Sequence, residues 1–379
     1  MTKRKGVDMS EKLKIGIGEQ PEKYDEYGVI DSFSKGFYHA LSKHADFIPF
    51  EEVKKGTPIN AMFSFGTMGA EYWENVLKSN LRNIVWLPDS VFYKNFELYN
   101  KYIDDKNFLL LDTVPSDKNP ITEYMPTLKH CNYFPQAVDL NFWKFQELKK
   151  ENDIVFLGSI IDLEEKDEVL KQKYPEDLLK IIYEMKKLSL AHPEQEFWNI
   201  YNAAKECFGL ELEKGMYHEI FSDLADICET EQRIKMIQAL SKFNVKVYGN
   251  GPWEKYINGS VQYCGQCSLK DSVEIINKSK ISLHIQPMKY SCGLHERFLN
   301  ASAVKTFTLM GQNKLIEENF KESFGYFNAS DFSDIADMAS DYLRHDEERM
   351  EKAVNANALV NHFHTWDNRA IDFIMLFRD

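Results

Sequence analysis

The sequence places three polar or charged side chains shortly after an apolar run. The run "KISLHIQ", residues 280–286, predicts a buried strand, and His295, Glu296 and Arg297 fall in the first turn of the helix predicted after it. A helix N-terminus offers N–H groups and a positive dipole end to anions, and arginine adds a planar fork of donors that matches phosphate oxygens. The stretch therefore predicts a diphosphate site. An ion pair of Arg297 with Glu296 or a loop carboxylate is the alternative interpretation.

Two further predicted strands end in glycine. Gly158 and Ser159 follow "DIVFL", and Gly249, Asn250 and Gly251 follow "VKVY". Open parallel sheets bind ligands beyond the carboxyl ends of their strands, and glycine lets a diphosphate approach the backbone closely. A single glycine also simply ends a strand. Three such strand ends on one sheet edge favour a binding site.

Short apolar runs alternate with helical periodicity along the whole chain, which is typical of an α/β fold with mainly parallel sheets. The predicted strands of the first half are residues 14–17, 61–65, 83–87, 107–111 and 132–134. Those of the second half are residues 152–159, 244–251, 261–265, 280–286, 304–310 and 324–328. Two α/β domains are therefore expected to meet near residue 150.

Residues 162–240 interrupt the second series of strands and carry helical stripes. In "PEDLLKIIYEMKKLSL" the residues Leu178, Leu179, Ile182, Met185 and Leu188 share one face. "TEQRIKMIQALSKF" repeats the pattern further on. The segment is predicted to be a helical insertion in the second domain, and such stripes are more often core than partner surface.

Composition excludes several classes of protein. The 379 residues are 44% apolar and 13% aromatic, which suits a globular protein with two cores. A net charge of −13 argues against general attraction to nucleic acid or acidic membranes, although a local basic cleft stays open. The basic N-terminus lacks the apolar core of a signal peptide, and no window suits a membrane span. We expect a cytoplasmic protein.

The six cysteines suggest reduced thiols. Cys264 and Cys267 in "CGQC" have the spacing of half a zinc site or of a redox motif. No second pair follows to complete four ligands. The favoured interpretation is a pair of thiols at the end of a strand.

An ordered set of segments resembles one family. The set is "YFPQAVDLNFW", "DIVFLGS", "TEQRIKMIQALSKFNVKVYGNG", "YCGQCSLKDSVEIINKSKISLHIQ", "GLHERFLNASAVKTFTLM" and "HTWDNRAIDFI". In order and spacing it is similar to the CgeB-like glycosyltransferases, known also through spore-maturation proteins and flagellar-type protein glycosyltransferases. The resemblance covers about residue 132 to the C-terminus, with a weaker match of "NIVWLPDS" to the family's N-terminal domain.

The resemblance implies a GT-B fold, in which two Rossmann-like domains face each other across a cleft. An N-terminal acceptor-side domain, residues 1–148, would face a donor domain, residues 149–360, that carries the helical insertion. A C-terminal helix, residues 361–379, would cross back to the first domain.

The resemblance also implies roles for individual residues in binding a nucleotide sugar. Gly158 and Ser159 would lie near the donor phosphates, and His295 and Arg297 at the diphosphate. The 262–265 loop, with Gln262, Tyr263 and Gly265, would lie near the base. Asn300 stands in "RFLN" where the family often has the glutamate of "RxFE", so it would bind the ribose hydroxyls without a charge.

The catalytic base is sought among carboxylates of the first domain. Asp89 follows a predicted strand in "WLPDS" and is the candidate, although Pro-Asp-Ser is also ordinary turn and helix-cap chemistry. Asp25 and Glu26, in the loop after "KIGIG", are held in reserve. The chain has no Asp-x-Asp motif, so no metal or other cofactor is expected to be required.

The leading hypothesis is transfer of a sugar from a UDP- or GDP-type donor to a protein, glycan or small acceptor. One alternative is a phage-type DNA-base glycosyltransferase, which the acidity of the chain disfavours. The other is a non-catalytic sugar-nucleotide-binding or assembly protein, which Asn300 keeps open.

Overall fold

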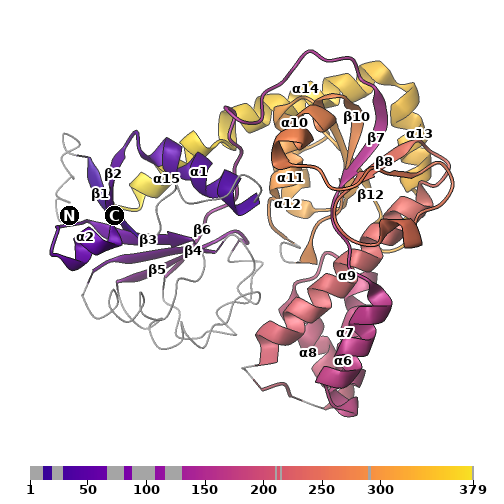
Figure 1. The fold of residues 1–379 in the computed structure, drawn as a ribbon, viewed down its shortest axis with the longest axis horizontal. Coiled ribbons are helices and arrows are strands. Elements are labelled where there is room, and N and C mark those ends of the chain that lie inside the picture. Colours follow the sequence, from indigo (N-terminus) through magenta and orange to yellow (C-terminus); the bar gives the residue numbers. More distant parts are fainter. Residues whose placement is uncertain are drawn as a thin grey trace.

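The structure is a computed structural model that describes residues 12–18, 29–65, 81–87, 107–115, 130–209, 211–213, 216–288 and 292–377. Two six-stranded sheets organise it, and every strand pairing within them is parallel. Figure 1 shows one sheet from each half of the chain, with the helices of residues 163–239 projecting beside the second.

The N-terminal sheet has the strand order β2-β1-β3-β4-β5-β6. Its strands are β1 (Leu13–Ile17), β2 (Ala45–Pro49), β3 (Ala61–Phe65), β4 (Asn83–Leu87), β5 (Phe108–Asp112) and β6 (Cys131–Tyr133). The central strands β4 and β5 are buried along their whole length, which explains why their apolar runs were visible in the sequence. The prediction missed β2, an edge strand that is mostly half-buried and ends at Pro49, because edge positions tolerate polar residues and proline.

The C-terminal sheet has the order β12-β11-β10-β7-β8-β9. Its strands are β7 (Asn152–Leu157), β8 (Val245–Tyr248), β9 (Gln262–Tyr263), β10 (Ser279–His284), β11 (Phe307–Gly311) and β12 (Gly325–Phe327). The strand predicted from residue 304 begins three residues later, because Val304 caps the preceding helix and Lys305 turns the chain with φ of 53°. The strands predicted to end at residues 159 and 251 end at 157 and 248, and their glycines lie in the turns that follow.

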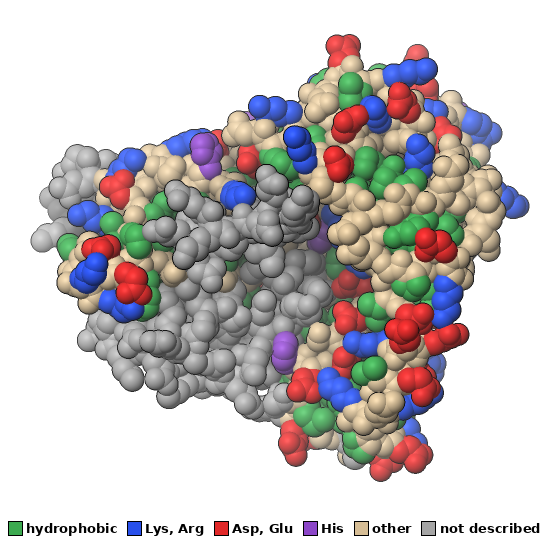
Figure 2. Space-filling view, in the orientation of Figure 1, with side chains coloured by type: hydrophobic (Ala, Val, Ile, Leu, Met, Phe, Trp, Pro, Cys, Tyr) green, Lys and Arg blue, Asp and Glu red, His purple; other side chains and the backbone are tan. Residues whose placement is uncertain are grey.

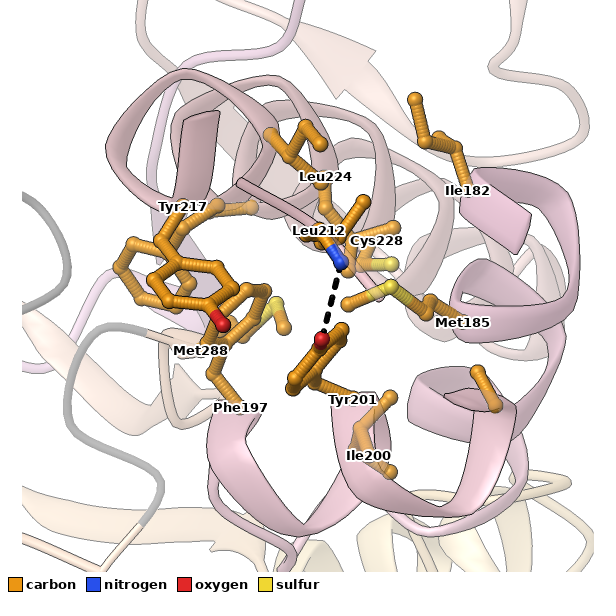
Figure 3. Packing of buried hydrophobic residues seen from close by; sticks show 14 of the residues in the cluster. Ile182, Met185, Phe197, Ile200, Tyr201, Leu212, Tyr217, Leu224, Cys228 and Met288 are labelled. Atoms are coloured by element: carbon orange, nitrogen blue, oxygen red, sulfur yellow. Dashed lines mark hydrogen bonds between the residues drawn. The ribbon is translucent and has the colours of Figure 1, made fainter. Parts of the chain in front are cut away.

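Helices cover both sheets and fill the segment predicted as a helical insertion. They are α1 (Val29–Leu41), α2 (Phe50–Lys54), α6 (Leu163–Lys173), α7 (Glu176–Ala191), α8 (Phe197–Phe208), α9 (Tyr217–Ala239), α10 (Leu269–Asn277), α11 (Glu296–Ala303), α12 (Lys314–Phe320), α13 (Ile335–Arg344), α14 (Asp346–Phe363) and α15 (Trp366–Met375). Helices α6–α9 form the insertion, and their apolar stripes pack on one another, as Figure 3 shows around Met185, Tyr201 and Leu224.

The last two helices connect the two sheets. Helix α14 packs on the C-terminal sheet, and after a turn at His364 and Thr365, α15 packs beside α1 on the N-terminal sheet. At the turn the chain pairs with the segment before β7, since Val138 donates to the His364 carbonyl at 3.0 Å and Trp366 donates to the Val138 carbonyl at 3.2 Å. The two passages of the chain between the sheets are therefore bonded to each other.

Candidate functional site

A cavity of about 180 Å³ lies at the carboxyl ends of β7, β8 and β10. Its lining brings together segments that are far apart in the sequence: Trp143, Gly158, Ser159, Tyr248, Gly249, Asn250, Cys267, Ser268, Ser272, Ser282, Glu296, Arg297 and Asn300 are among the lining residues. The end of a parallel sheet is where open α/β folds bind ligands, since helix N-termini gather there. This cavity is the candidate site.

Two turns, residues 158–161 and 249–251, form one wall of the cavity and are bonded to each other; we call this the turn wall. Gly158 donates its N–H to the Tyr248 carbonyl at 2.8 Å, and Ile160 donates to the Asn250 carbonyl at 2.9 Å. The N–H of Asn250 in return donates to Ser159 Oγ at 3.0 Å. The hydroxyl of Ser159 therefore already has a structural partner in the neighbouring turn.

The glycines of the second turn have a packing role. Gly249 and Gly251 have φ of 147° and 105°, and a Cβ on either would overlap the carbonyl of Gly158 or Ile160 respectively. At Gly158 itself an added Cβ would lie 2.6 Å from the Phe156 ring. The sequence prediction explained the glycine of the first turn by approach of a diphosphate. In the structure Gly158 packs beside the Phe156 ring, and Gly249 and Gly251 let the second turn approach the first. Gly158 and Gly249 still line the cavity.

Helix α11 forms the opposite wall, which we call the helix wall. His295 caps the helix and accepts the Arg297 N–H through Nδ1 at 3.2 Å. The side chain of Gln136, which is fully buried before β7, accepts the Glu296 N–H through Oε1 at 2.8 Å. Two N–H groups of the first turn thus already have protein acceptors, so an anion here would depend mainly on side chains. Arg297 and Asn300 both line the cavity.

Two histidine rings stack behind this wall. His284 and His295 have ring centroids 4.9 Å apart and an angle of 20° between the rings. Complete burial, helped by the positive charge of Arg297, lowers the pKa of His284 to about 3, so this ring is neutral at physiological pH. Since His295 accepts at Nδ1, its neutral form carries the ring proton on Nε2, where it is a donor.

The segment predicted to lie near the base supports the turn wall. Tyr263 donates its hydroxyl to the Gly249 carbonyl at 2.8 Å, and the Gly265 carbonyl accepts the Gly249 N–H at 3.1 Å. Gln262, Tyr263 and Gly265 do not contribute to the described lining, which includes Gln266, Cys267 and Ser268 instead. Ser268 and Asp271 form a capping box at the start of α10, and the "SLKD" spacing was a usable sequence signal for that helix start.

Cys264 and Cys267 are free thiols. Cys267 lines the cavity, and burial raises the pKa of its thiol, so it is not an activated thiolate. Burial, followed by interaction with Cys264, raises the pKa of Tyr248 to about 12. These groups contribute shape and neutral polar surface to the cavity.

The three predicted catalytic carboxylates, Asp89, Asp25 and Glu26, lie outside the described residues, and their assignment stays a prediction. Within the part of the chain that the structure describes, no group of three His, Cys, Asp or Glu side chains suits a metal ion. Sequence reasoning missed Trp143 and Ser272, which line the cavity, and Gln136, which bonds to the helix wall, because all three positions depend on long-range packing.

Comparisons with known proteins bear on the fold and on the class of enzyme. Residues 232–375 match a family model described as glycosyl transferase-like. The structure resembles sucrose-phosphate synthase from Thermosynechococcus elongatus, with a TM-score of 0.60 and 9% identity over 97% of this chain and 98% of that one. It also resembles the T4 phage β-glucosyltransferase in complex with UDP-glucose, with a TM-score of 0.56 and 12% identity over 97% and 100% of the two chains.

The chain has the GT-B fold. The comparisons confirm this prediction and the predicted enzyme class, a glycosyltransferase, whereas they do not test the narrower CgeB-like resemblance or the site residues. A curated relative from Aquifex aeolicus (strain VF5), of unassigned function, is 18% identical over 177 residues, which are 44% of this chain and 43% of that protein. Among the described helices, none is long and apolar enough to cross a membrane.

Proposed function

We propose that the cavity binds a nucleoside-diphosphate sugar of the UDP or GDP type and that the chain transfers its sugar to a hydroxyl of a protein, glycan or small acceptor. The observation that carries the proposal is the convergence of Ser159, Arg297 and Asn300 on one cavity at the carboxyl end of a parallel sheet. A UDP donor is the first to test, because a solved protein of similar fold was crystallised with UDP-glucose.

The helix wall supplies the groups that this donor needs. Arg297 would bind the diphosphate, since its charge persists at any physiological pH and its fork matches phosphate oxygens. His295, which caps the helix but is absent from the cavity lining, would contribute a ring N–H donor at the diphosphate. Asn300 would hydrogen-bond the ribose hydroxyls, and this bond is weaker than one to the glutamate that the resembling family often has there.

The transfer step requires stabilisation of the leaving nucleotide and removal of a proton from the acceptor hydroxyl. Positive charge at the diphosphate stabilises the departing nucleotide as the anomeric bond breaks. An inverting enzyme also needs a base near the acceptor hydroxyl, and Asp89 is the candidate, with Asp25 and Glu26 in reserve. The donor oxygens need no bridging metal if cationic side chains neutralise them, and we propose that none is required.

A donor screen tests the proposal. Purified protein is incubated with UDP-, GDP- and dTDP-sugars, and the nucleotide released is measured to monitor hydrolysis and transfer. Calorimetry measures the affinity for the free nucleoside diphosphates. We expect binding and turnover with one class of donor, and we expect both to survive EDTA. Binding without turnover would point to the non-catalytic binder. Loss of activity with EDTA and recovery with Mg²⁺ or Mn²⁺ would overturn the metal-free mechanism; one solved T4 β-glucosyltransferase complex contains UDP and Mn²⁺.

A DNA-base acceptor is the second candidate, because one solved protein of similar fold is a DNA-modifying β-glucosyltransferase. Its weakness here is electrostatic. The chain carries a charge of −13, and on the face shown in Figure 2 the Lys and Arg side chains of the described residues are interspersed with Asp and Glu. Binding to duplex DNA that falls steeply with rising salt would favour this candidate, since phosphate contacts release counterions.

A further inference from the structure

Helix α9 belongs to two hydrophobic cores at once. Its first half, from Tyr217 to Cys228, contributes to the core of the helical insertion. Its last turns, from Ile234 to Ile237, contribute to the core of the C-terminal sheet. Four polar residues between the two stretches are buried: Glu229, Thr230, Gln232 and Arg233. The junction of the two cores is therefore polar.

Two of these residues, Arg233 and Thr230, bind the turn wall of the cavity. Arg233 Nη1 donates to the Ser159 carbonyl at 2.6 Å, and Nη2 donates to Glu229 Oε2 at 2.8 Å. Thr230 Oγ1 accepts the Ile161 N–H at 3.2 Å. The peptide between Ser159 and Ile160 is thereby held at both ends, because its N–H is bonded to the Asn250 carbonyl.

The insertion also contacts the loop that leads into the helix wall. Met288 lies in the insertion core, beside Phe197 and Tyr217 in Figure 3. Glu196 Oε1, from the residue before α8, accepts the Cys292 N–H at 3.2 Å. Both walls of the cavity thus have a support in the same helical insertion, although the residues of the insertion named here are absent from the cavity lining.

We propose that the helical insertion supports the donor cavity and that Arg233 is a positioning residue, which fixes the orientation of the Ser159 peptide toward a bound diphosphate. This inference rests on the proposed function and goes beyond it. Arginine suits the role because its planar fork reaches the carbonyl and the carboxylate together, whereas a lysine ammonium is a point charge on a flexible stem. Both partners are buried, so loss of the guanidinium leaves the Glu229 carboxylate without its cation.

A matched pair of substitutions separates positioning from stability. Arg349 on α14 is 5% exposed, donates Nη1 to the Tyr342 carbonyl at 2.6 Å and pairs with Asp346, so it has the same kind of contacts away from the cavity. Arg233→Met and Arg349→Met are compared by thermal unfolding, by calorimetry with UDP and GDP, and by amide hydrogen exchange without ligand. We expect both variants to lose stability. Only Arg233→Met should show faster amide exchange at Ile160 and Ile161, and only in that variant should nucleotide affinity fall about tenfold.

Three results decide the inference. If Arg233→Met and Arg349→Met show the same nucleotide affinity and the same exchange at Ile160 and Ile161, Arg233 is merely structural and the inference is wrong. If Arg233→Met does not fold, Arg233→Lys replaces it in the experiment. We then expect nucleotide binding about threefold weaker than in the wild type and faster exchange at Ile160 and Ile161. Wild-type affinity together with wild-type exchange in Arg233→Lys would overturn the inference. If the wild-type protein binds neither nucleotide, the proposed function fails. An increase in amide exchange confined to residues 160–161 in Arg233→Met would still support a role of Arg233 in positioning the turn.

Discussion

The two walls of the cavity differ in what they present to a ligand. In the turn wall, residues 158–161 and 249–251, backbone groups bond across the turns or to residues behind them, and glycines allow the close approach. In the helix wall, the first two N–H groups are taken up by Gln136 and His295, while Arg297 and Asn300 line the cavity. The turn wall therefore fixes a shape, and the helix wall supplies charge and hydrogen bonds. Substitutions in the turn wall should lower stability and act on affinity only by moving the turns, whereas substitutions in the helix wall should lower affinity directly.

The largest effect is expected outside both walls. If Asp89 removes the proton of the acceptor hydroxyl, Asp89→Asn should lower kcat about 100- to 10,000-fold while nucleotide affinity measured by calorimetry stays unchanged. Asparagine is as good a helix cap as aspartate, so a purely structural Asp89 predicts wild-type kinetics. An unchanged kcat would turn attention to Asp25 and Glu26.

Glycine replacement tests the turn wall. Gly249→Ala should lower the free energy of unfolding by about 3 kcal/mol, since its Cβ would overlap the backbone of Gly158 at a φ that L residues rarely adopt. The control is Gly265→Ala, at φ of 80° with no atom within 4 Å of the new Cβ, where about 1 kcal/mol of backbone strain is expected. Urea unfolding measures both. Equal losses would show that the contact between the turns does not matter.

Arg297 tests the helix wall. Arg297→Ala should weaken binding of the preferred nucleoside diphosphate by about 1.5 to 3 kcal/mol, the range for hydrogen bonds to charged groups. Arg297→Lys is the control that keeps the charge and loses the fork, so it should bind with intermediate affinity. Calorimetry that finds the same affinity for wild type and Arg297→Ala would remove this residue from the site.

Acid should destabilise the protein through its buried histidines. Burial lowers the pKa of His284 to about 3, with help from Arg297, and lowers that of His364 to about 4. Both values lie below the unfolded value of 6.5, so the unfolded chain binds more protons in this range and stability falls as the pH drops below 6.5. For His284 the loss at pH 5 is about 2 kcal/mol. Between pH 7.5 and pH 5, the urea midpoint of His284→Gln should fall less than that of the wild type. An equal fall in the two proteins would contradict a neutral His284.

The smallest effect is expected at Asn300. If its amide binds the ribose, Asn300→Ala should weaken nucleotide binding by about 1 kcal/mol and reduce the preference for UDP over 2′-deoxy-UDP or 3′-deoxy-UDP. Asn300→Asp, which restores a carboxylate near the position where the resembling family has glutamate, is the comparison. A deoxynucleotide preference that is identical in wild type and Asn300→Ala would exclude a ribose contact.

The sequence by itself determined the two parallel sheets, the helical insertion and the sheet edge at which the cavity lies. These features depend on local regularities: apolar runs of four residues in β4 and β5, and helical stripes such as the one through Ile182 and Met185. It also indicated Arg297, because a charged helix start after a buried strand is visible in a single segment, whereas Asn300 was indicated only by the family resemblance.

The tertiary structure decided what those residues meet. The acceptance of the Glu296 N–H by Gln136, 160 residues away, and the bond from Arg233 to the Ser159 carbonyl, 74 residues away, have no local sequence signal. The same holds for the glycines of the turn wall, since the sequence shows that a backbone approaches closely but does not show which partner approaches. Periodicity reports which face of an element is buried, whereas the orientation of polar groups across a cavity depends on how distant elements pack together.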